Sequence, residues 1–139
     1  QPIHEGEVVV RIGGTVMTEE EFRAYILTVS RYNAVQIGEE THLVDTPTAL
    51  GGMNHSCDAN LWMSDEVTVV ARRDIAVDEE LTQDYALYTT ASTWAIKPCR
   101  CGTPVCRQVV TGSDWQLPVV QARYRGHFSP FLNERIRRL

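Results

Sequence analysis

Residues 54–60 read Asn54-His55-Ser56-Cys57-Asp58-Ala59-Asn60, and this stretch decides the fold. It holds one cysteine, while three others lie together downstream in Cys99-Arg100-Cys101-Gly102-Thr103-Pro104-Val105-Cys106. Three cysteines in one short loop and a fourth brought from a distance are typical of a structural zinc site with four thiolate ligands. A Zn²⁺ ion held by Cys57, Cys99, Cys101 and Cys106 would fasten residues 54–60 to residues 99–106, with a pocket between the two segments.

Two disulfides in a secreted protein are the alternative use of four cysteines. The opening residues do not have the basic and then apolar pattern of a secretion signal. Cys99 and Cys101 are also awkwardly placed to bridge with each other. Zinc is therefore favoured over disulfides.

The composition is that of a single globular domain. The chain has 139 residues, of which 43% are hydrophobic and 22% charged. No apolar run is long enough to span a bilayer, so we expect no membrane partner. The net charge of −5 argues against direct nucleic-acid binding and favours a basic partner, such as a lysine-rich peptide. The basic residues Arg135, Arg137 and Arg138 are interpreted as a solvated helix face.

Short Val/Ile-rich runs between turn signals predict many short strands. We expect them at residues 7–12, 31–37, 41–44, 61–63 and 67–72. Asp45-Thr46-Pro47 breaks the pattern. Residues 81–85 fit either a short strand or an irregular segment.

Helices are few. Thr18 and Glu21 have the spacing of a capping box, and the apolar stripe Phe22, Tyr25, Ile26 and Val29 predicts a helix that faces the core. Further helices are expected at residues 118–125 and after Ser129-Pro130. The sequence therefore predicts a β-rich α+β domain.

Three motifs together resemble those of SET-domain protein-lysine methyltransferases. Residues 54–60 resemble the family's Asn-His-Ser-Cys-x-Pro-Asn motif, with Ala59 in place of the proline. Residues 79–85, Glu79-Glu80-Leu81-Thr82-Gln83-Asp84-Tyr85, are similar to its Glu-Glu-Leu-Thr-x-Asp-Tyr motif, and residues 99–106 to its post-SET zinc loop. All three occur in the family's order and spacing, so the combination is far more specific than any one motif.

The resemblance implies a SET fold, with small curved β-sheets around a knot-like core in which residues 54–57 pass beneath residues 81–85. We assign residues 1–92 to the SET domain, 93–112 to a post-SET zinc-binding segment and 113–139 to a C-terminal helical extension packed on the same domain. The family's Gly-x-Gly turn would lie upstream of Ile3, and we expect it to precede Gln1 in the natural protein.

The resemblance also implies an activity. Family members transfer a methyl group from S-adenosyl-L-methionine to a lysine side chain, here of a protein or peptide such as a histone-like basic protein. Asn54 and His55 would contact the cofactor, with Cys101 and Trp94 in the wall of its pocket. The four thiolates leave no open position on Zn²⁺, so its role would be structural.

Two tyrosines are the candidates for catalysis. By resemblance, Tyr85 lies beside the site of methyl transfer and touches the cofactor, and Tyr32 falls where the family has a second channel tyrosine. By pattern alone, Tyr85 would be a half-buried tyrosine bonded to a backbone carbonyl, but the Asp-Tyr context favours function. Asp84 is interpreted as a turn or ion-pair partner. Gln83 replaces the Tyr or Phe that governs how many methyl groups are added.

Two other classes of function stay open. One is a SET-fold module without catalysis that docks a peptide or protein, and the other is a zinc-stabilised structural domain without a cofactor. Gly51-Gly52-Met53, in place of a bulky basic lead into the Asn-His pair, removes one expected contact. His4, His42 and His127 are assigned to surface or core packing. We expect a cytoplasmic location in a bacterium, and a nuclear or cytoplasmic one in a eukaryote.

Overall fold

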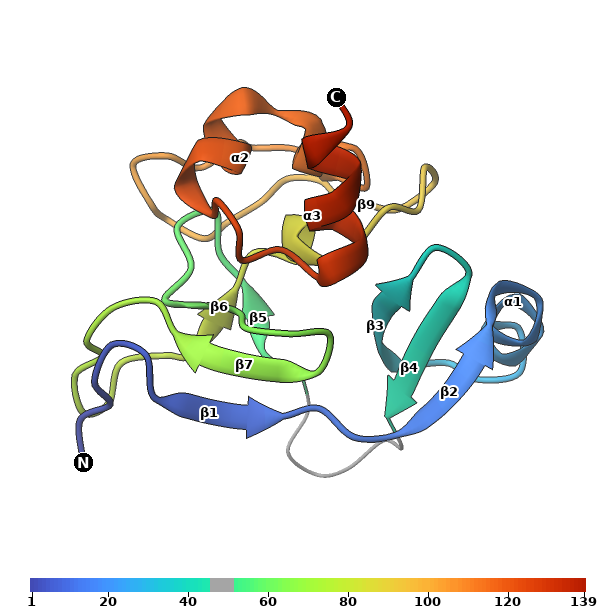
Figure 1. The fold of residues 1–139 in the computed structure, drawn as a ribbon, viewed down its shortest axis with the longest axis horizontal. Coiled ribbons are helices and arrows are strands. Elements are labelled where there is room, and N and C mark those ends of the chain that lie inside the picture. Colours follow the sequence, from blue (N-terminus) through green and yellow to red (C-terminus); the bar gives the residue numbers. More distant parts are fainter. Residues whose placement is uncertain (46–51) are drawn as a thin grey trace.

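The computed structural model describes residues 1–45 and 52–139, and it consists of short elements arranged in small sheets (Figure 1). In chain order the elements are β1 (Val8–Arg11), β2 (Thr15–Thr18), α1 (Glu19–Ile26), β3 (Asn33–Gly38), β4 (Thr41–Asp45), β5 (Asn54–His55), β6 (Leu61–Met63), β7 (Thr68–Ala71), β8 (Thr82–Gln83), the 3-10 turn η1 (Tyr85–Leu87), β9 (Ala95–Ile96), β10 (Val110–Thr111), the 3-10 turn η2 (Asp114–Gln116), α2 (Pro118–Arg123) and α3 (Pro130–Arg137).

The strands of the described residues form four sheets. Two are three-stranded, with the orders β1-β7-β6 and β2-β4-β3, and two are pairs, β5-β8 and β9-β10. The five predicted strands correspond to β1, β3, β4, β6 and β7 to within two residues at each end. The sequence did not predict β5, β9 or β10, because a strand of two residues has too little alternation to be recognised. It also missed β2, which runs directly into the N-cap of α1.

The main core lies between the β1-β7-β6 sheet and the C-terminal helices, which cover it in Figure 1. Strand β7 is buried along its whole length. From the C-terminal side, the core receives Trp115, Val120, Tyr124, Phe128 and Leu132. Residues 113–139 therefore share one core with the strands. Helix α2 ends at Arg123, two residues before its predicted end.

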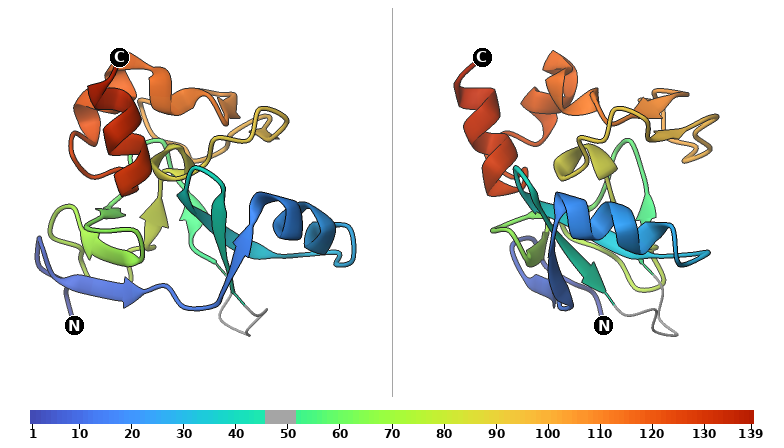
Figure 2. Two further views of the ribbon diagram at one scale, coloured as in Figure 1. Left: turned by 45° about the vertical axis from the view of Figure 1, so that its right-hand side comes forward. Right: turned by 90° about the vertical axis from the view of Figure 1, so that its right-hand side faces the viewer.

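Helix α1 begins as predicted, but it does not enter the core. Glu21 N–H donates to Thr18 Oγ1 and Thr18 N–H to the Glu21 carboxylate, which completes the capping box. The helix ends at Ile26 rather than Val29, because the amide and hydroxyl of Thr28 both bond to the Tyr25 carbonyl. None of its residues is buried. Figure 2 shows α1 at the outer edge of the β2-β4-β3 sheet, so the predicted core-facing stripe packs only at the periphery.

The β5-β8 pair joins the motif of residues 54–60 to the motif of residues 79–85. Its strands run parallel, with Asn54 opposite Thr82 and His55 opposite Gln83, and Ser56 N–H continues the ladder to the Gln83 carbonyl at 3.0 Å. Residues 81–85 are thus partly strand and partly the start of η1. Two parallel neighbouring strands need a long connection between them, so β5 and β8 are distant in the sequence and meet only in the folded chain.

A ribbon made by β9 and β10 carries the cysteine loop. Ile96 lies opposite Val110, and Cys99 N–H donates to the Gln108 carbonyl at 2.7 Å. The loop is therefore anchored at both ends before any metal is considered. Thr46 and Pro47 of the predicted break, and Gly51 before the Asn-His pair, lie outside the described residues.

Candidate active site and metal centre

The β5-β8 pair places Asn54 and His55 beside the start of η1. The Asn54 side-chain amide donates to the Glu80 carboxylate at 2.7 Å, which orients it across the motif of residues 79–85. His55 is nearly fully buried, and Tyr85 N–H donates to its Nδ1 at 3.1 Å. The backbone of Tyr85 is thus bonded directly to the Asn-His pair.

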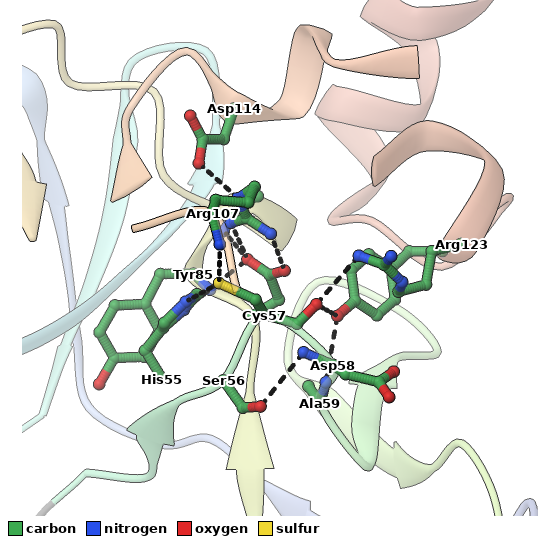
Figure 3. Close-up of polar contacts among 12 residues, drawn as sticks. His55, Ser56, Cys57, Asp58, Ala59, Tyr85, Arg107, Asp114 and Arg123 are labelled. Atoms are coloured by element: carbon green, nitrogen blue, oxygen red, sulfur yellow. Dashed lines mark hydrogen bonds and ion pairs between the residues drawn. The ribbon is translucent and has the colours of Figure 1, made fainter. Parts of the chain in front are cut away.

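The hydrogen bonds of His55 determine which ring nitrogen carries the proton. Because Nδ1 accepts from Tyr85, a neutral ring is protonated on Nε2, which lies 3.3 Å from Cys57 Sγ (Figure 3). Burial lowers the pKa of His55, and the Asp84 carboxylate, 3.7 Å from Nδ1, opposes this only in part. His55 is therefore a neutral donor toward the Cys57 sulfur rather than a ligand of a metal.

Tyr85 lies between two cavities and is the one described residue that lines both. The first, of about 420 Å³, is bordered by Asn54, His55, Ser56, Glu80, Thr82, Tyr85, Ile96, Cys99, Arg100 and Cys101. The second, of about 550 Å³, has a more apolar wall that includes Tyr32, Val35, Met53, Leu81, Tyr85, Tyr88 and Trp94. Asn54 and His55 thus face one space, and Tyr32 faces the other.

The Tyr85 hydroxyl is held by the backbone. It donates to the Met53 carbonyl at 2.7 Å, as expected for a half-buried tyrosine. Its ring packs against Trp94 and Tyr88, with centroids 5.8 and 5.9 Å away. Burial raises the pKa of Tyr85, so the side chain remains a neutral phenol. Because the proton points at Met53, the oxygen lone pairs are left to accept a further hydrogen bond.

The four cysteines meet in one cluster. Their sulfur atoms all lie within 4.8 Å of one another, and Cys57 Sγ is 3.9 Å from Cys99 Sγ. This separation is far longer than a disulfide bond. Four sulfurs placed tetrahedrally at about 2.3 Å from one Zn²⁺ ion would be about 3.8 Å apart. The donor set and its spacing therefore fit a structural zinc site.

The protein surroundings affect the cysteines unequally. Burial raises the pKa of Cys57 and Cys99. Burial also opposes ionisation of Cys101, but hydrogen bonds, of which that from Thr103 is the largest, lower its pKa to about 6. A bound divalent cation deprotonates coordinating thiols outright. With Zn²⁺ bound, these four residues would hold the ion and join residues 54–60 to the cysteine loop.

Arg107 makes a buried ion-pair network that the sequence did not predict. Its guanidinium donates to both oxygens of Asp84 at 2.7 and 2.9 Å, and its Nε donates to Asp114 at 2.8 Å. Asp84 is fully buried, so its interpretation as an ion-pair partner is confirmed. The only signals were the position of Arg107 directly after Cys106 and that of Asp84 directly before Tyr85.

Within the described part of the chain, the remaining candidates make no hydrogen bond to the Arg107 network. Tyr32 is 43% exposed and packs edge-on against Phe22 of α1 at 5.6 Å. Trp94, expected with Cys101 in the wall of the cofactor pocket, lines the second cavity and not the first, and it also packs against the cysteine cluster. His42 pairs with Glu19 at 2.5 Å, and His127 stacks on Trp62, as packing residues do. His4 is exposed.

Comparison with known proteins identifies the family. A protein-family model described as the SET domain matches residues 1–86. Histone-lysine N-methyltransferase ash1 of Drosophila melanogaster is 30% identical over 149 residues, which cover 90% of this chain and 6% of ash1. Histone-lysine N-methyltransferase ATX2 of Arabidopsis thaliana is 32% identical over 89 residues, which cover 59% of this chain and 7% of ATX2. The chain thus spans less than a tenth of the length of these relatives.

Solved structures share the fold. The methyltransferase domain of human histone-lysine N-methyltransferase SETMAR aligns with a TM-score of 0.61 and 24% identity, over 78% of this chain and 50% of that one. KRYPTONITE in complex with mCHG DNA and SAH aligns with a TM-score of 0.58 and 24% identity, over 78% of this chain and 25% of that one. No helix of the described residues has the length and apolarity to cross a bilayer. The family model covers well over half of the sequence and the fold agrees with it, so this chain belongs to the SET-domain family.

Proposed function

We propose that this chain is a protein-lysine N-methyltransferase domain that uses S-adenosyl-L-methionine. One observation carries the proposal: Tyr85 lies between a cavity bordered by the Asn-His pair and the cysteine loop and a second cavity bordered by Tyr32. A methyl donor in the first and a lysine side chain in the second would meet beside the Tyr85 ring. The relatives ash1 and ATX2 are named histone-lysine N-methyltransferases, and the KRYPTONITE structure holds SAH.

The first cavity suits the methyl donor. Asn54 and His55 border it together with the polar side chains of Glu80 and Thr82, and Cys101 lies in the same wall. When bound, S-adenosyl-L-methionine supplies a methyl group on a sulfonium sulfur; the amine lone pair forms the new N–C bond as the S–C bond breaks, and the amine proton leaves to solvent. Zn²⁺ at the four cysteines would keep this wall ordered without taking part in the chemistry.

The second cavity suits the acceptor. A free lysine amine has a pKa of about 10.4, so it must be made neutral before it can attack. The apolar part of the wall, including Val35, Leu81 and Trp94, disfavours the charged ammonium form. The Tyr85 oxygen can then accept a hydrogen bond from an N–H of the amine while its own O–H still donates to the Met53 carbonyl. Positioning of this kind supplies much of the rate in such a transfer.

A basic protein is the proposed substrate. The net charge of −5 favours the approach of a lysine-rich segment, as in histone-like proteins. It does not favour nucleic acid, whose phosphates need a cationic surface. Direct binding of nucleic acid is therefore not part of the proposal.

One observation favours a second candidate, a peptide-binding module without catalysis. The hydrogen bond from Tyr85 to Met53 is one that a purely structural tyrosine also makes. A module of this kind would keep both cavities but would not transfer a methyl group.

The test measures cofactor binding and methyl transfer separately. The full chain is titrated with S-adenosyl-L-methionine by calorimetry and then assayed, with a labelled methyl donor, on core histones and lysine-rich peptides. All variants carry Lys97→Arg, because Lys97 is the chain's sole lysine and its removal leaves no side-chain acceptor on the enzyme itself. Tyr85→Phe is compared with the parent.

We expect transfer by the parent, with turnover about 100-fold lower in Tyr85→Phe. Cofactor affinity should stay within about twofold, since the phenol is not a major part of the first cavity's polar wall. Binding without transfer to any acceptor would support the peptide-binding module instead. Absence of cofactor binding would refute the assignment of the first cavity to the methyl donor.

A further inference from the structure

Arg107 and Asp114 lie outside residues 1–86, which the SET-domain model matches, yet their network reaches Asp84 at the centre of the site. Figure 3 shows the Arg107 side chain bonded to the Asp114 carboxylate, and the Arg107 backbone N–H pointing at the Cys57 sulfur. The Arg107 side chain is 10% exposed, and those of Asp84 and Asp114 are 0% and 8% exposed. Three charges are thus packed away from solvent at one point.

The first arm of the network leads to Tyr85. The Asp84 carboxylate that receives both guanidinium N–H groups also accepts from Ala86 N–H at 3.0 Å, and so caps η1. Because Asp84 directly precedes Tyr85, the ion pair fixes where the η1 turn begins. The direction in which the Tyr85 ring leaves the backbone depends on that turn.

The second arm leads to the cysteine cluster. Arg107 follows Cys106 in sequence, and its backbone N–H points at Cys57 Sγ, 3.4 Å away. A shift of the Arg107 backbone would therefore move Cys106 directly and weaken the hydrogen bond from Arg107 N–H to Cys57 Sγ. The third arm, from Nε to Asp114, holds the Arg107 side chain from the C-terminal segment (residues 113–139), and Thr111 of β10 also donates to Asp114 at 3.0 Å.

Stability alone does not account for this arrangement. A buried ion-pair network is often no more stable than well-packed apolar residues of the same size, because removing charges from water is costly. What it provides is geometry: a planar guanidinium with N–H groups in a fixed fork binds two carboxylates in one orientation. A lysine ammonium has the charge but not the fork.

We infer that Arg107 is a positioning residue that fixes Tyr85 relative to the cysteine loop. The inference rests on the proposed function only where it concerns turnover, since the structural linkage can be measured without any reaction. By joining η1, the cysteine loop and the C-terminal segment, Arg107 fixes the position of the two cavities relative to each other.

The test compares Arg107→Lys with Arg135→Lys in the full chain. Arg135 lies on α3, its ion pair with Glu39 is half-exposed, and no hydrogen bond among the described residues joins it to Asp84, Tyr85 or the cysteine loop, which makes it the matched control. Three quantities are measured for each: zinc per chain, hydrogen exchange of the Tyr85 and Ala86 amides, and kcat and KM. Arg107→Met is included as a stronger perturbation, and Arg107→Lys carries the test if that variant does not fold.

For Arg107→Lys we expect unchanged zinc content and hydrogen exchange at Tyr85 and Ala86 that is at least about tenfold faster. We expect kcat to fall by about 10- to 100-fold with the KM for S-adenosyl-L-methionine nearly unchanged. Arg135→Lys should match the parent in all three. If no protein, the parent included, transfers a methyl group, the exchange data still test the linkage while the proposed function fails. Exchange that is unchanged at these amides, or faster everywhere alike, would overturn the inference.

Discussion

Tyr124→Phe tests how the C-terminal helices support the central motif. The Tyr124 hydroxyl accepts from Ala59 N–H at 3.2 Å and donates to the Cys57 carbonyl at 3.4 Å. Both Tyr124 and Ala59 are fully buried. The Cys57 carbonyl keeps a second donor, Arg123, at 3.0 Å, so it stays satisfied in the variant. The Ala59 N–H, in contrast, loses the hydroxyl that it bonds.

The expected loss follows from that one orphaned donor. Leaving a buried donor without a partner costs about 1–3 kcal/mol. With about 2.1 cal/mol/K of unfolding entropy per residue, a chain of 139 residues has about 0.29 kcal/mol/K, so Tm should fall by about 3–10 °C. The measurement is thermal unfolding at pH 7 with zinc held in fixed excess, followed by far-ultraviolet circular dichroism and by fluorescence.

The pH dependence gives a second and sharper criterion. Burial raises the pKa of Tyr124 above the value of about 10 that it has when unfolded. The stabilisation that comes with a raised pKa is complete below pH 10 and is lost as the pH rises toward the folded value. Above pH 10, therefore, the free energy of unfolding of the parent should fall by up to about 1.4 kcal/mol per pH unit, and that of Tyr124→Phe should not show this fall. The two stability curves should converge with rising pH.

Tyr25→Phe is the control, because Tyr25 is half-buried on α1 and no described residue bonds its hydroxyl. It should change stability by less than about 0.5 kcal/mol. Equal effects of the two substitutions at pH 7, or a gap between Tyr124→Phe and the parent that stays constant from pH 7 to 11, would show that the hydroxyl does not support the motif as described.

Two further outcomes follow from the site and the surface. Cys101→Ser removes one of four clustered ligands and part of the first cavity's wall, so zinc per chain and affinity for S-adenosyl-L-methionine should fall together. The control Lys97→Arg, in the same segment, should change neither. Cofactor affinity retained without zinc would contradict this. The pKa of Glu79 is lowered from 4.5 to about 2, chiefly by its hydrogen bond with Arg73, so the stability it adds is complete above pH 4.5 and is lost as the pH falls toward 2. Glu79→Gln should therefore be less stable by about 1 kcal/mol at pH 6, after allowance for solvent screening, and equal to the parent near pH 2, as urea unfolding across this range would measure.

Local patterns predicted much of the site. The spacing of Cys57 and the downstream cysteines indicated the cluster, because four thiols at such intervals have few other uses. The capping box at Thr18 was recognisable for the same reason, since both partners lie within one turn of helix. In the capping box the interacting residues are close in sequence, and in the cysteine cluster they belong to motifs that resemble those of one family.

Pairings between distant residues that no recognised motif contains as partners were not predictable in this way. Arg107 and Asp84 are 23 residues apart, and Tyr124 and Ala59 are 65 apart. Arginine, aspartate and tyrosine occur on most surfaces, so the residue types alone do not reveal that these are buried. The stripe on α1 misled for a related reason: periodicity reports that Phe22 and its neighbours share a face, but not whether that face meets the core or a neighbouring strand.

These long-range contacts also change where the functional unit ends. The SET-domain match stops at residue 86, but the groups that hold Cys57 in place come from Arg107, Arg123 and Tyr124. The last two lie in the segment that supplies Trp115, Val120, Phe128 and Leu132 to the core. A segment that both fills the core and bonds the backbone of a metal ligand cannot be separable from the site. The C-terminal helices are therefore a structural requirement of the Asn-His-Ser-Cys motif in this chain. The position of that motif depends on groups that follow Cys57 by 50 residues or more: the backbone N–H of Arg107 and the side chains of Arg123 and Tyr124.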